Sequence, residues 1–253
     1  MNDQKKVQTI TSDWVTHIHT VLGSQRGRCK ASDNNGNSIL LEWEKVDPTS
    51  SRLNAIIKEA SELLVQTYVP MELEFAKKHP ETVDSEMFLK PLASLFQHGV
   101  DKVDWIAVEQ GLTKNMHQFF LTTDFAKYSG QNDIQIFVAA KDEGSGATLG
   151  FIQFLITPQF EYGVIKAAFF GVAAGSENIG IEKLLLSMIF KLIPEVTRVF
   201  LHTRITNKKA LDLYQDLGFV KFSGPLTFWA DMEYLVQKSN VLQEGCRATE
   251  MVD

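Results

Sequence analysis

The sequence predicts an α/β fold of the α+β type, in which helices flank a mixed, mostly antiparallel central sheet. Two observations predict this class. Amphipathic helical patterns precede a block of three β-rich runs, and an alternation of helix, strand, helix and strands follows that block. The chain has 253 residues, of which 44% are hydrophobic, so it is long enough to bury the core of one large domain.

The first elements are a short helix and a hairpin. Residues 11–13 are Thr-Ser-Asp, which are good helix caps, and they precede an apolar helical face within residues 14–22. Residues 33–37 form an Asp/Asn/Gly cluster that is typical of a tight turn, because Asn and Gly accept positive φ angles. This turn predicts that residues 26–31 pair with a strand over residues 39–46.

Two helices are predicted next. The first follows Pro48, and Ser50 or Ser51 caps it. The second covers residues 85–97. Residues 103–128 are ambiguous, since residues 103–108 fit a short strand and residues 115–125 fit either a helix or a loop. The apolar positions of the first helix recur at helical spacing at Leu53, Ile56, Ile57, Ala60, Leu63, Leu64 and Tyr68.

The second half of the chain has the composition of strands separated by two helices. Three β-rich runs are joined by an Asp-Glu-Gly-Ser-Gly connection and by a turn that contains Pro158. Strands are predicted at 134–140, 149–157, 164–172, 198–205, 219–222 and 227–236, and helices at 178–192 and 208–217.

These elements give three segments. Residues 1–37 are predicted to be an N-terminal extension, residues 38–237 the domain, and residues 238–253 a mobile C-terminal tail. No internal repeat or low-complexity block competes with this division.

Composition excludes several classes of function. A net charge of −6 argues against a nucleic-acid partner, and no apolar run reaches the ~20 residues needed to cross a membrane. The two cysteines, Cys29 and Cys246, form no disulfide framework or zinc motif, so a reducing cytoplasm is the expected compartment. The six histidines form no close cluster, and no metal site is predicted.

One segment carries a recognisable motif. Residues 207–219 read NKKALDLYQDLGF, which resembles the N-x-x-A-x-x-L-Y-x-x-x-G-F pattern of the GNAT superfamily of acyl-CoA N-acyltransferases. The pattern also makes physical sense, because Asn207 can cap a helix and Gly218 can end it in a left-handed conformation. The resemblance implies a GNAT-like fold with acetyl-CoA as the acyl donor.

The resemblance also implies roles for two residues of this motif. Tyr214 matches the tyrosine that often protonates the departing CoA thiolate, and Asn207 matches the asparagine that contacts the CoA arm. A phenol suits this role, since its ordinary pKa of about 10 keeps it protonated at neutral pH.

A second family element is a loop of pattern Q/R-x-x-G-x-G/A, which holds the CoA diphosphate at a helix start. Gly180 occupies its first glycine position, but Glu177 and Glu182 replace the usual Gln/Arg and the second small residue. Two carboxylates repel a diphosphate, although their side chains can face water and a nearby lysine adds compensating charge. The residues expected to bind the cofactor are Phe170, Gly171, Val172, Asn178, Gly180, Ile181, Lys183 and Asn207.

The general base has to be found elsewhere, because residues 164–172 contain no carboxylate. His202 lies five positions before the motif asparagine, where ribosomal-protein N-acetyltransferases of the family place an acid–base glutamate. A histidine accepts a proton near neutral pH. The alternative is a histidine that simply fills the sheet surface. Glu109, Glu161 and Tyr162 are candidates for binding a cationic amine, and their alternative role is that of solvated turn or strand-end residues.

The sequence therefore favours an N-acetyltransferase that moves an acetyl or related acyl group from acetyl-CoA to a primary amine, which is a small molecule or a protein. The alternative hypothesis is a catalytically degenerate member of the same fold that acts as a binding or interaction module. Neither the acceptor nor the oligomeric state follows from the sequence.

Overall fold

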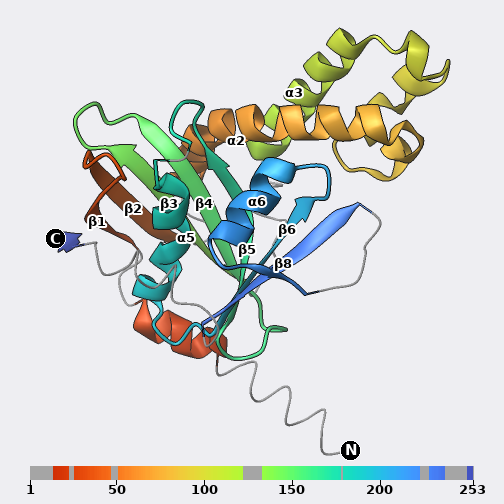
Figure 1. The fold of residues 1–253 in the computed structure, drawn as a ribbon. Helices are drawn as coiled ribbons and strands as arrows, with labels where there is room; N and C mark the ends of the chain where they lie inside the picture. The colour runs from red at the N-terminus through yellow and green to blue at the C-terminus, as the bar shows by residue number, and fades with distance from the viewer. Residues whose placement is uncertain are drawn as a thin grey trace, which may run out of the picture.

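The computed structural model of the chain describes residues 14–22, 26–46, 51–121, 133–177, 179–222, 228–236 and 250–252. They form a nine-stranded sheet in the order β7-β8-β6-β5-β4-β3-β2-β1-β9, with helices on both faces (Figure 1). Neighbouring strands are antiparallel except β5 and β6, which are parallel. The strands are β1 (Arg26–Ser32), β2 (Ser38–Val46), β3 (Ile134–Asp142), β4 (Thr148–Ile156), β5 (Val164–Val172), β6 (Arg198–Arg204), β7 (Val220–Lys221), β8 (Trp229–Leu235) and β9 (Glu250–Val252).

This architecture confirms the predicted fold class and the predicted pairing of the first two strands. Arg26 pairs with Glu44 and Ser32 pairs with Ser38, so the hairpin closes at the Asp/Asn/Gly turn. The C-terminal tail predicted to be mobile contributes β9, which pairs with β1 through residues 250–252. Both ends of the chain therefore add to the sheet.

Residues 14–22, within the segment expected to be an N-terminal extension, also pack into the core. Residues 14–21 are helical, as predicted, whereas the capping residues 11–13 lie outside the described residues. Trp14 and Ile18 are fully buried, and the indole Nε1–H of Trp14 donates to the carbonyl oxygen of Val164 over 3.3 Å. This helix is thus anchored to the first residue of β5.

Two long helices cover one face of the sheet. They are α2 (Ser51–Lys78) and α3 (Trp105–Leu121), and the buried aromatic side chains of Phe137, Phe151 and Phe169 face them. The helix predicted over residues 85–97 is wrong. That region forms short 3-10 turns at Pro80–Ser85 and Lys90–Phe96.

Residues 103–108, which fit a short strand by sequence, instead contain the start of α3, and Asp104 caps this helix. The Asp104 carboxylate accepts hydrogen bonds from the backbone N–H groups of Ile106 and Ala107, both over 3.1 Å. This satisfies free donors of the first turn, as a helix N-cap does. The ambiguous region of residues 103–128 is therefore helical over residues 105–121.

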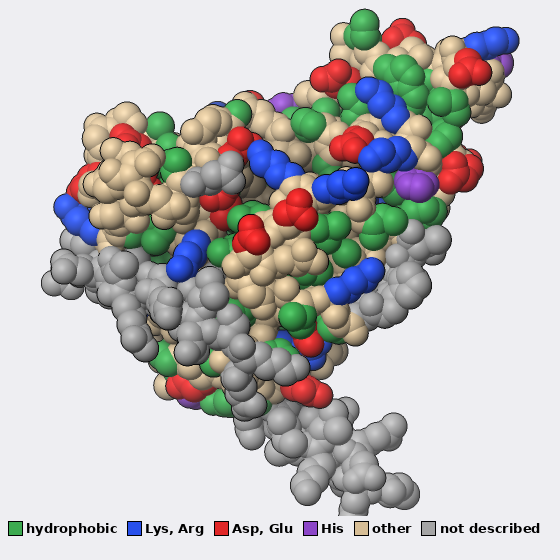
Figure 2. All heavy atoms as spheres, viewed as in Figure 1, with side chains coloured by type: hydrophobic (Ala, Val, Ile, Leu, Met, Phe, Trp, Pro, Cys, Tyr) green, Lys and Arg blue, Asp and Glu red, His purple; other side chains and the backbone are tan. Residues whose placement is uncertain are grey.

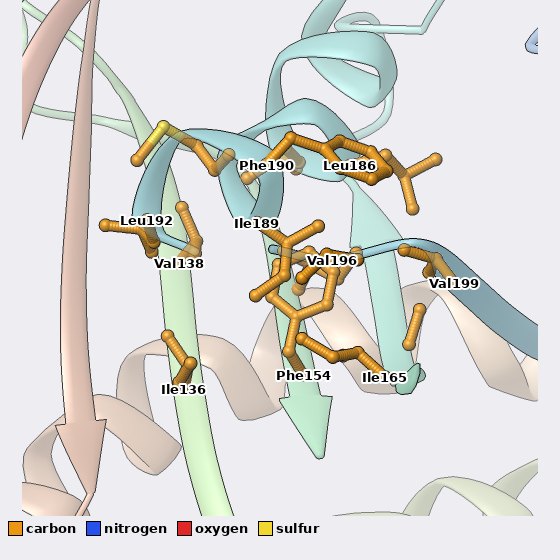
Figure 3. Packing of buried hydrophobic residues seen from close by; sticks show 14 of the residues in the cluster. Ile136, Val138, Phe154, Ile165, Leu186, Ile189, Phe190, Leu192, Val196 and Val199 are labelled. Carbon is orange, nitrogen blue, oxygen red and sulfur yellow. The ribbon is translucent and has the colours of Figure 1, made fainter. Parts of the chain in front are cut away.

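The opposite face carries the main hydrophobic core. There, α5 (Ile181–Leu192) and α6 (Lys208–Asp216) pack together with the helix of residues 14–21. Figure 3 shows Leu186, Ile189 and Phe190 of α5 among side chains from the strands. The strand residues in that view are Ile136, Val138, Phe154, Ile165 and Val199.

Candidate active site

A groove opens where β5 and β6 separate. Their parallel pairing covers only Val164–Lys166 opposite Arg198–Phe200. Two residues later, Ala168 is an extra residue opposite β4, and such a β-bulge bends its strand. The groove has a volume of about 410 Å³ and is lined by residues from α2, β5, β6 and α6 and from the loop before α5.

The edge of β5 that faces this groove is close to α2. Phe170, Gly171 and Val172, which the sequence predicts to bind the cofactor, all line the groove. A Cβ on Gly171 would lie 2.5 Å from Leu63 Cδ2 and 2.8 Å from Thr67 Oγ1. The absence of a side chain therefore lets α2 approach the strand.

Asn207 and Tyr214 bring the motif helix to the same groove. Asn207 caps α6, since its Oδ1 accepts from the N–H of Ala210 over 3.2 Å, and Gly218 ends the segment with a φ of 91°. Tyr214 is buried 6.3 Å from the ring of Phe170, centroid to centroid. Burial raises the pKa of its hydroxyl well above the usual range, and a second tyrosine, Tyr68, adds to that shift.

Tyr68 of α2 is a groove residue that sequence reasoning assigned to a helix core. Burial raises its pKa to about 12, and its phenol oxygen accepts a hydrogen bond from the backbone N–H of Phe170. Its ring packs against Phe120 and Phe169 at centroid distances of 6.3 and 6.0 Å. Helical spacing alone does not reveal the role of the hydroxyl, because the ring belongs to the apolar face.

His202 of β6 lines the groove and forms a pair that the sequence did not predict. Its Nδ1 is hydrogen-bonded to the Asp231 carboxylate of β8, directly opposite in the antiparallel register. The Asp231 side chain is only 7% exposed, whereas that of His202 is 36% exposed. The alternation of polar and apolar residues in β8 could have pointed to Asp231, because it places residues 231 and 233 on one polar face of the strand.

Lys166 of β5 completes the charges around this pair. It pairs in the sheet with Phe200, two residues before His202 on β6. Burial lowers the pKa of Lys166, while the negative charge of Asp231 opposes that shift. Three neighbouring strands therefore contribute a lysine, a histidine and an aspartate to one region of the sheet.

The loop before α5 is only partly in the groove. Glu177 and Glu182 line it, and Glu177 forms an ion pair with Lys209 of α6 over 2.7 Å. Glu182 is buried, with 6% of its surface exposed. Lys209 thus offsets one of the two carboxylates that depart from the family pattern.

Three other residues of this region that were predicted to bind the cofactor, Gly180, Ile181 and Lys183, do not line the groove. Gly180 caps α5 with a φ of 93°, and a Cβ there would lie 2.6 Å from Asn34 Oδ1. Ile181 is fully buried in the core, and Lys183 is half-buried on α5. Asn178 lies outside the described residues.

The three predicted acceptor residues are not brought to the groove. Glu161 and Tyr162 precede β5, at the end of the strand opposite to Gly171. The Tyr162 ring packs 4.5 Å from Trp14, centroid to centroid. Glu109 is exposed on α3 and does not line the groove. The turn that carries Glu161 leads into the N-terminal end of β5, whereas the groove is at the C-terminal end.

A larger groove, of about 550 Å³, lies beside the first half of α2. Lys141 bridges Glu42 and Glu59 there over 3.0 and 2.7 Å. None of the predicted site residues lines it. The smaller groove is therefore the stronger candidate, because it combines a strand edge, two tyrosine side chains and the histidine of the His202–Asp231 pair.

The surface has no extended field of one charge on the face shown in Figure 2, where acidic and basic side chains alternate. Within the described ranges, no helix is long and apolar enough to cross a membrane. The same residues contain no group of three or more His, Cys, Asp or Glu side chains that could hold a metal ion.

Comparison with known proteins places these features in context. A model of the acetyltransferase (GNAT) family matches residues 101–219. No curated protein sequence matches the chain.

Several solved structures are similar in fold. The GNAT domain of PAT from S. lividans is 12% identical, with 82% of this chain and 96% of that chain covered and a TM-score of 0.46. PaiA N-acetyltransferase from Thermoplasma acidophilum, in complex with coenzyme A, is 15% identical, with coverages of 77% and 98% and a TM-score of 0.42. Nourseothricin acetyltransferase is 15% identical, with a TM-score of 0.33. Its alignment covers 40% of this chain and 65% of that one, slightly less than two thirds.

Proposed function

Because residues 101–219 match a model of the acetyltransferase (GNAT) family, we propose that this protein transfers an acetyl or related acyl group from acetyl-CoA to a primary amine. The observation that carries the proposal is the meeting of Tyr214, His202 and the edge of β5 in one groove. A direct transfer needs both reactants side by side and no covalent intermediate on the protein.

The donor fits the groove along β5. In the described part of the chain, β5 has no strand partner on the β6 side beyond Lys166, so backbone groups of Phe170–Val172 can bind the extended arm of CoA. The N–H of Phe170 is held by the Tyr68 phenol in the free protein. We therefore expect Tyr68 to release this donor when the acyl-CoA binds.

The proton transfers are assigned to two side chains. His202 takes a proton from the amine, whose nitrogen then attacks the thioester carbonyl carbon. The C–S bond breaks, and Tyr214 donates a hydrogen bond and a proton toward the departing thiolate. Burial keeps the Tyr214 phenol protonated across neutral and alkaline pH, which favours its role as a donor.

The donor assignment is tested by the effect of acetyl-CoA on stability. A ligand that binds only the native state at a concentration of 100 Kd raises the free energy of unfolding by about 2.7 kcal/mol. We expect a rise in Tm with acetyl-CoA in a thermal unfolding assay, and transfer to amines in a screen of small amines and peptides. Absence of any Tm rise at millimolar CoA, acetyl-CoA and longer acyl-CoAs would exclude acyl-CoA as the ligand.

The degenerate binding module remains the second candidate, and the buried carboxylate of Glu182 in the groove favours it. A negative charge there opposes a diphosphate. The two candidates differ in the transfer assay. The enzyme acylates an amine, whereas the binding module acylates none, whether or not CoA raises its Tm.

Glu182 and Glu177 give a matched pair of variants for this charge. Glu182→Gln removes a buried charge and should tighten CoA binding about 10-fold, which is about 1.4 kcal/mol. Glu177→Gln should change the Kd less than about threefold, since this residue is 41% exposed and already paired with Lys209. Calorimetric titration measures both. Equal CoA affinity in folded Glu182→Gln and the natural protein would place the diphosphate away from this loop.

A further inference from the structure

His202, Asp231 and Lys166 come from three neighbouring strands and form a group that the family resemblance does not assign. Asp231 is buried on β8, the neighbour of β6, and its carboxylate accepts a hydrogen bond from Nδ1 of His202. The Lys166 side chain is half-buried on the other side of β6 and interacts electrostatically with Asp231. The Asp231 carboxylate therefore interacts with the imidazole directly and with a cationic side chain electrostatically.

The hydrogen bond to Asp231 determines which nitrogen of the neutral imidazole carries the proton. A carboxylate only accepts hydrogen bonds, so Nδ1 of His202 carries the proton and the lone pair of the neutral ring is on Nε2. His202 lines the groove while Asp231 does not. The hydrogen bond therefore holds Nδ1 on the buried side and leaves Nε2 as the basic atom.

We propose that Asp231 is a positioning residue that orients His202 as the base for the acceptor amine, and that Lys166 is a counter-charge to Asp231 on the neighbouring strand. This proposal rests on the proposed acyl transfer. Asp231 alone favours the imidazolium, because an opposite charge at hydrogen-bond distance stabilises it. The positive charge of Lys166 attracts Asp231 and repels the imidazolium, so it works in the opposite sense.

The remaining charges near His202 are engaged elsewhere. Glu233 of β8 pairs with Arg198 over 2.8 Å, and Arg204 of β6 pairs with carboxylates from α2 and the following turns. The titratable groups that line the groove with His202 are Tyr68 and Glu74 of α2, Tyr214 and Lys209 of α6, and Glu177 and Glu182 around the start of α5. The Asp231 carboxylate is the group that contacts the imidazole directly.

The test is an NMR titration of the His202 imidazole in the protein without substrates, with His202→Gln used to assign the signal. We expect Asp231→Asn to move the titration midpoint down by about one pH unit and Lys166→Met to move it up by a similar amount. Glu233→Gln is the matched control, a carboxylate two residues along β8, and should leave the midpoint within about 0.3 unit.

Activity provides the second readout. In Asp231→Asn, kcat should fall by about 10- to 100-fold, and the acidic limb of the pH–rate profile should move to lower pH, as the NMR midpoint does. Lys166→Met should move that limb to higher pH. A purely structural role for Asp231 would leave the limb in place.

The two failures are distinguishable. An unchanged titration midpoint of His202 in Asp231→Asn overturns the proposed roles of Asp231 and Lys166, even when acyl transfer is observed. If Asp231→Asn does not fold, an unchanged midpoint in Lys166→Met has the same meaning. If the titration midpoints shift but the protein binds no acyl-CoA and acylates no amine, the proposed function is overturned. The catalytic role of His202, Asp231 and Lys166 is then overturned with it.

Discussion

Tyr214→Phe is expected to lower kcat by about 10²-fold, the lower end of the range for general acid catalysis. The hydroxyl is the only part removed, so the ring contacts with Phe170 and Phe219 are retained. The effect is placed at the lower end because burial raises the pKa of this phenol and makes it a weaker acid. Steady-state kinetics at saturating acetyl-CoA and amine measure the change.

Tyr68→Phe is the matched control for this result. It removes the other phenol of the groove, which accepts the Phe170 N–H in the free protein. We expect less than a tenfold fall in kcat, with the larger change in KM for acetyl-CoA, because this hydroxyl contacts the donor-binding strand. If Tyr214→Phe keeps full kcat across pH while Tyr68→Phe loses it, the roles of the two phenols are exchanged.

Arg204→Leu is expected to lower the free energy of unfolding by about 3–5 kcal/mol, since it leaves a buried carboxylate without its partner. The Arg204 guanidinium is 2% exposed and donates to both oxygens of Glu72, over 3.1 and 2.8 Å, and to Glu86 over 2.6 Å. It lies between the rings of Phe75 and Trp229, at 3.9 and 4.0 Å from their centroids. Urea unfolding measures the loss.

Burial explains the size of this effect. Burial raises the pKa of Glu72 although the positive charge of Arg204 lowers it, so desolvation has the larger effect on this pKa. The double variant Arg204→Leu with Glu72→Leu should therefore be more stable than Arg204→Leu alone. Arg198→Leu is the control on the same strand, and its more exposed pair with Glu233 should cost about 1 kcal/mol or less. A loss below that in Arg204→Leu would contradict a structural role for the buried pair.

The parts of the site that depend on residues close in sequence could be predicted, and the parts that depend on distant residues could not. The motif helix was predictable, because Asn207 caps α6 through a residue three positions away and Gly218 ends it locally. The α-helix predicted at residues 85–97 did not form. Pro91 lies within that range, and a short 3-10 helix over Lys90–Phe96 replaces the α-helix, while Asp104 caps the next helix.

The candidates for binding the acceptor do not line the groove, for a different reason. Glu161 and Tyr162 were chosen for their chemistry beside a strand, but the bulge at Ala168 and the parting of β5 from β6 place the groove at the other end of that strand. Strand polarity within the sheet decided this, and a local pattern carries no information about which end of a strand faces the cofactor.

The contiguous residues of this chain specify the helix caps, the alternating strands and the family motif, since each depends on neighbours within about one helical turn or along one strand. The chemistry of the groove depends on partners that are distant in sequence. His202 and Asp231 are 29 positions apart, and Arg204 and Glu72 are 132 apart. These pairs exist only because the register of β6 against β8 and the packing of α2 bring them together, and burial then sets their protonation by removing water.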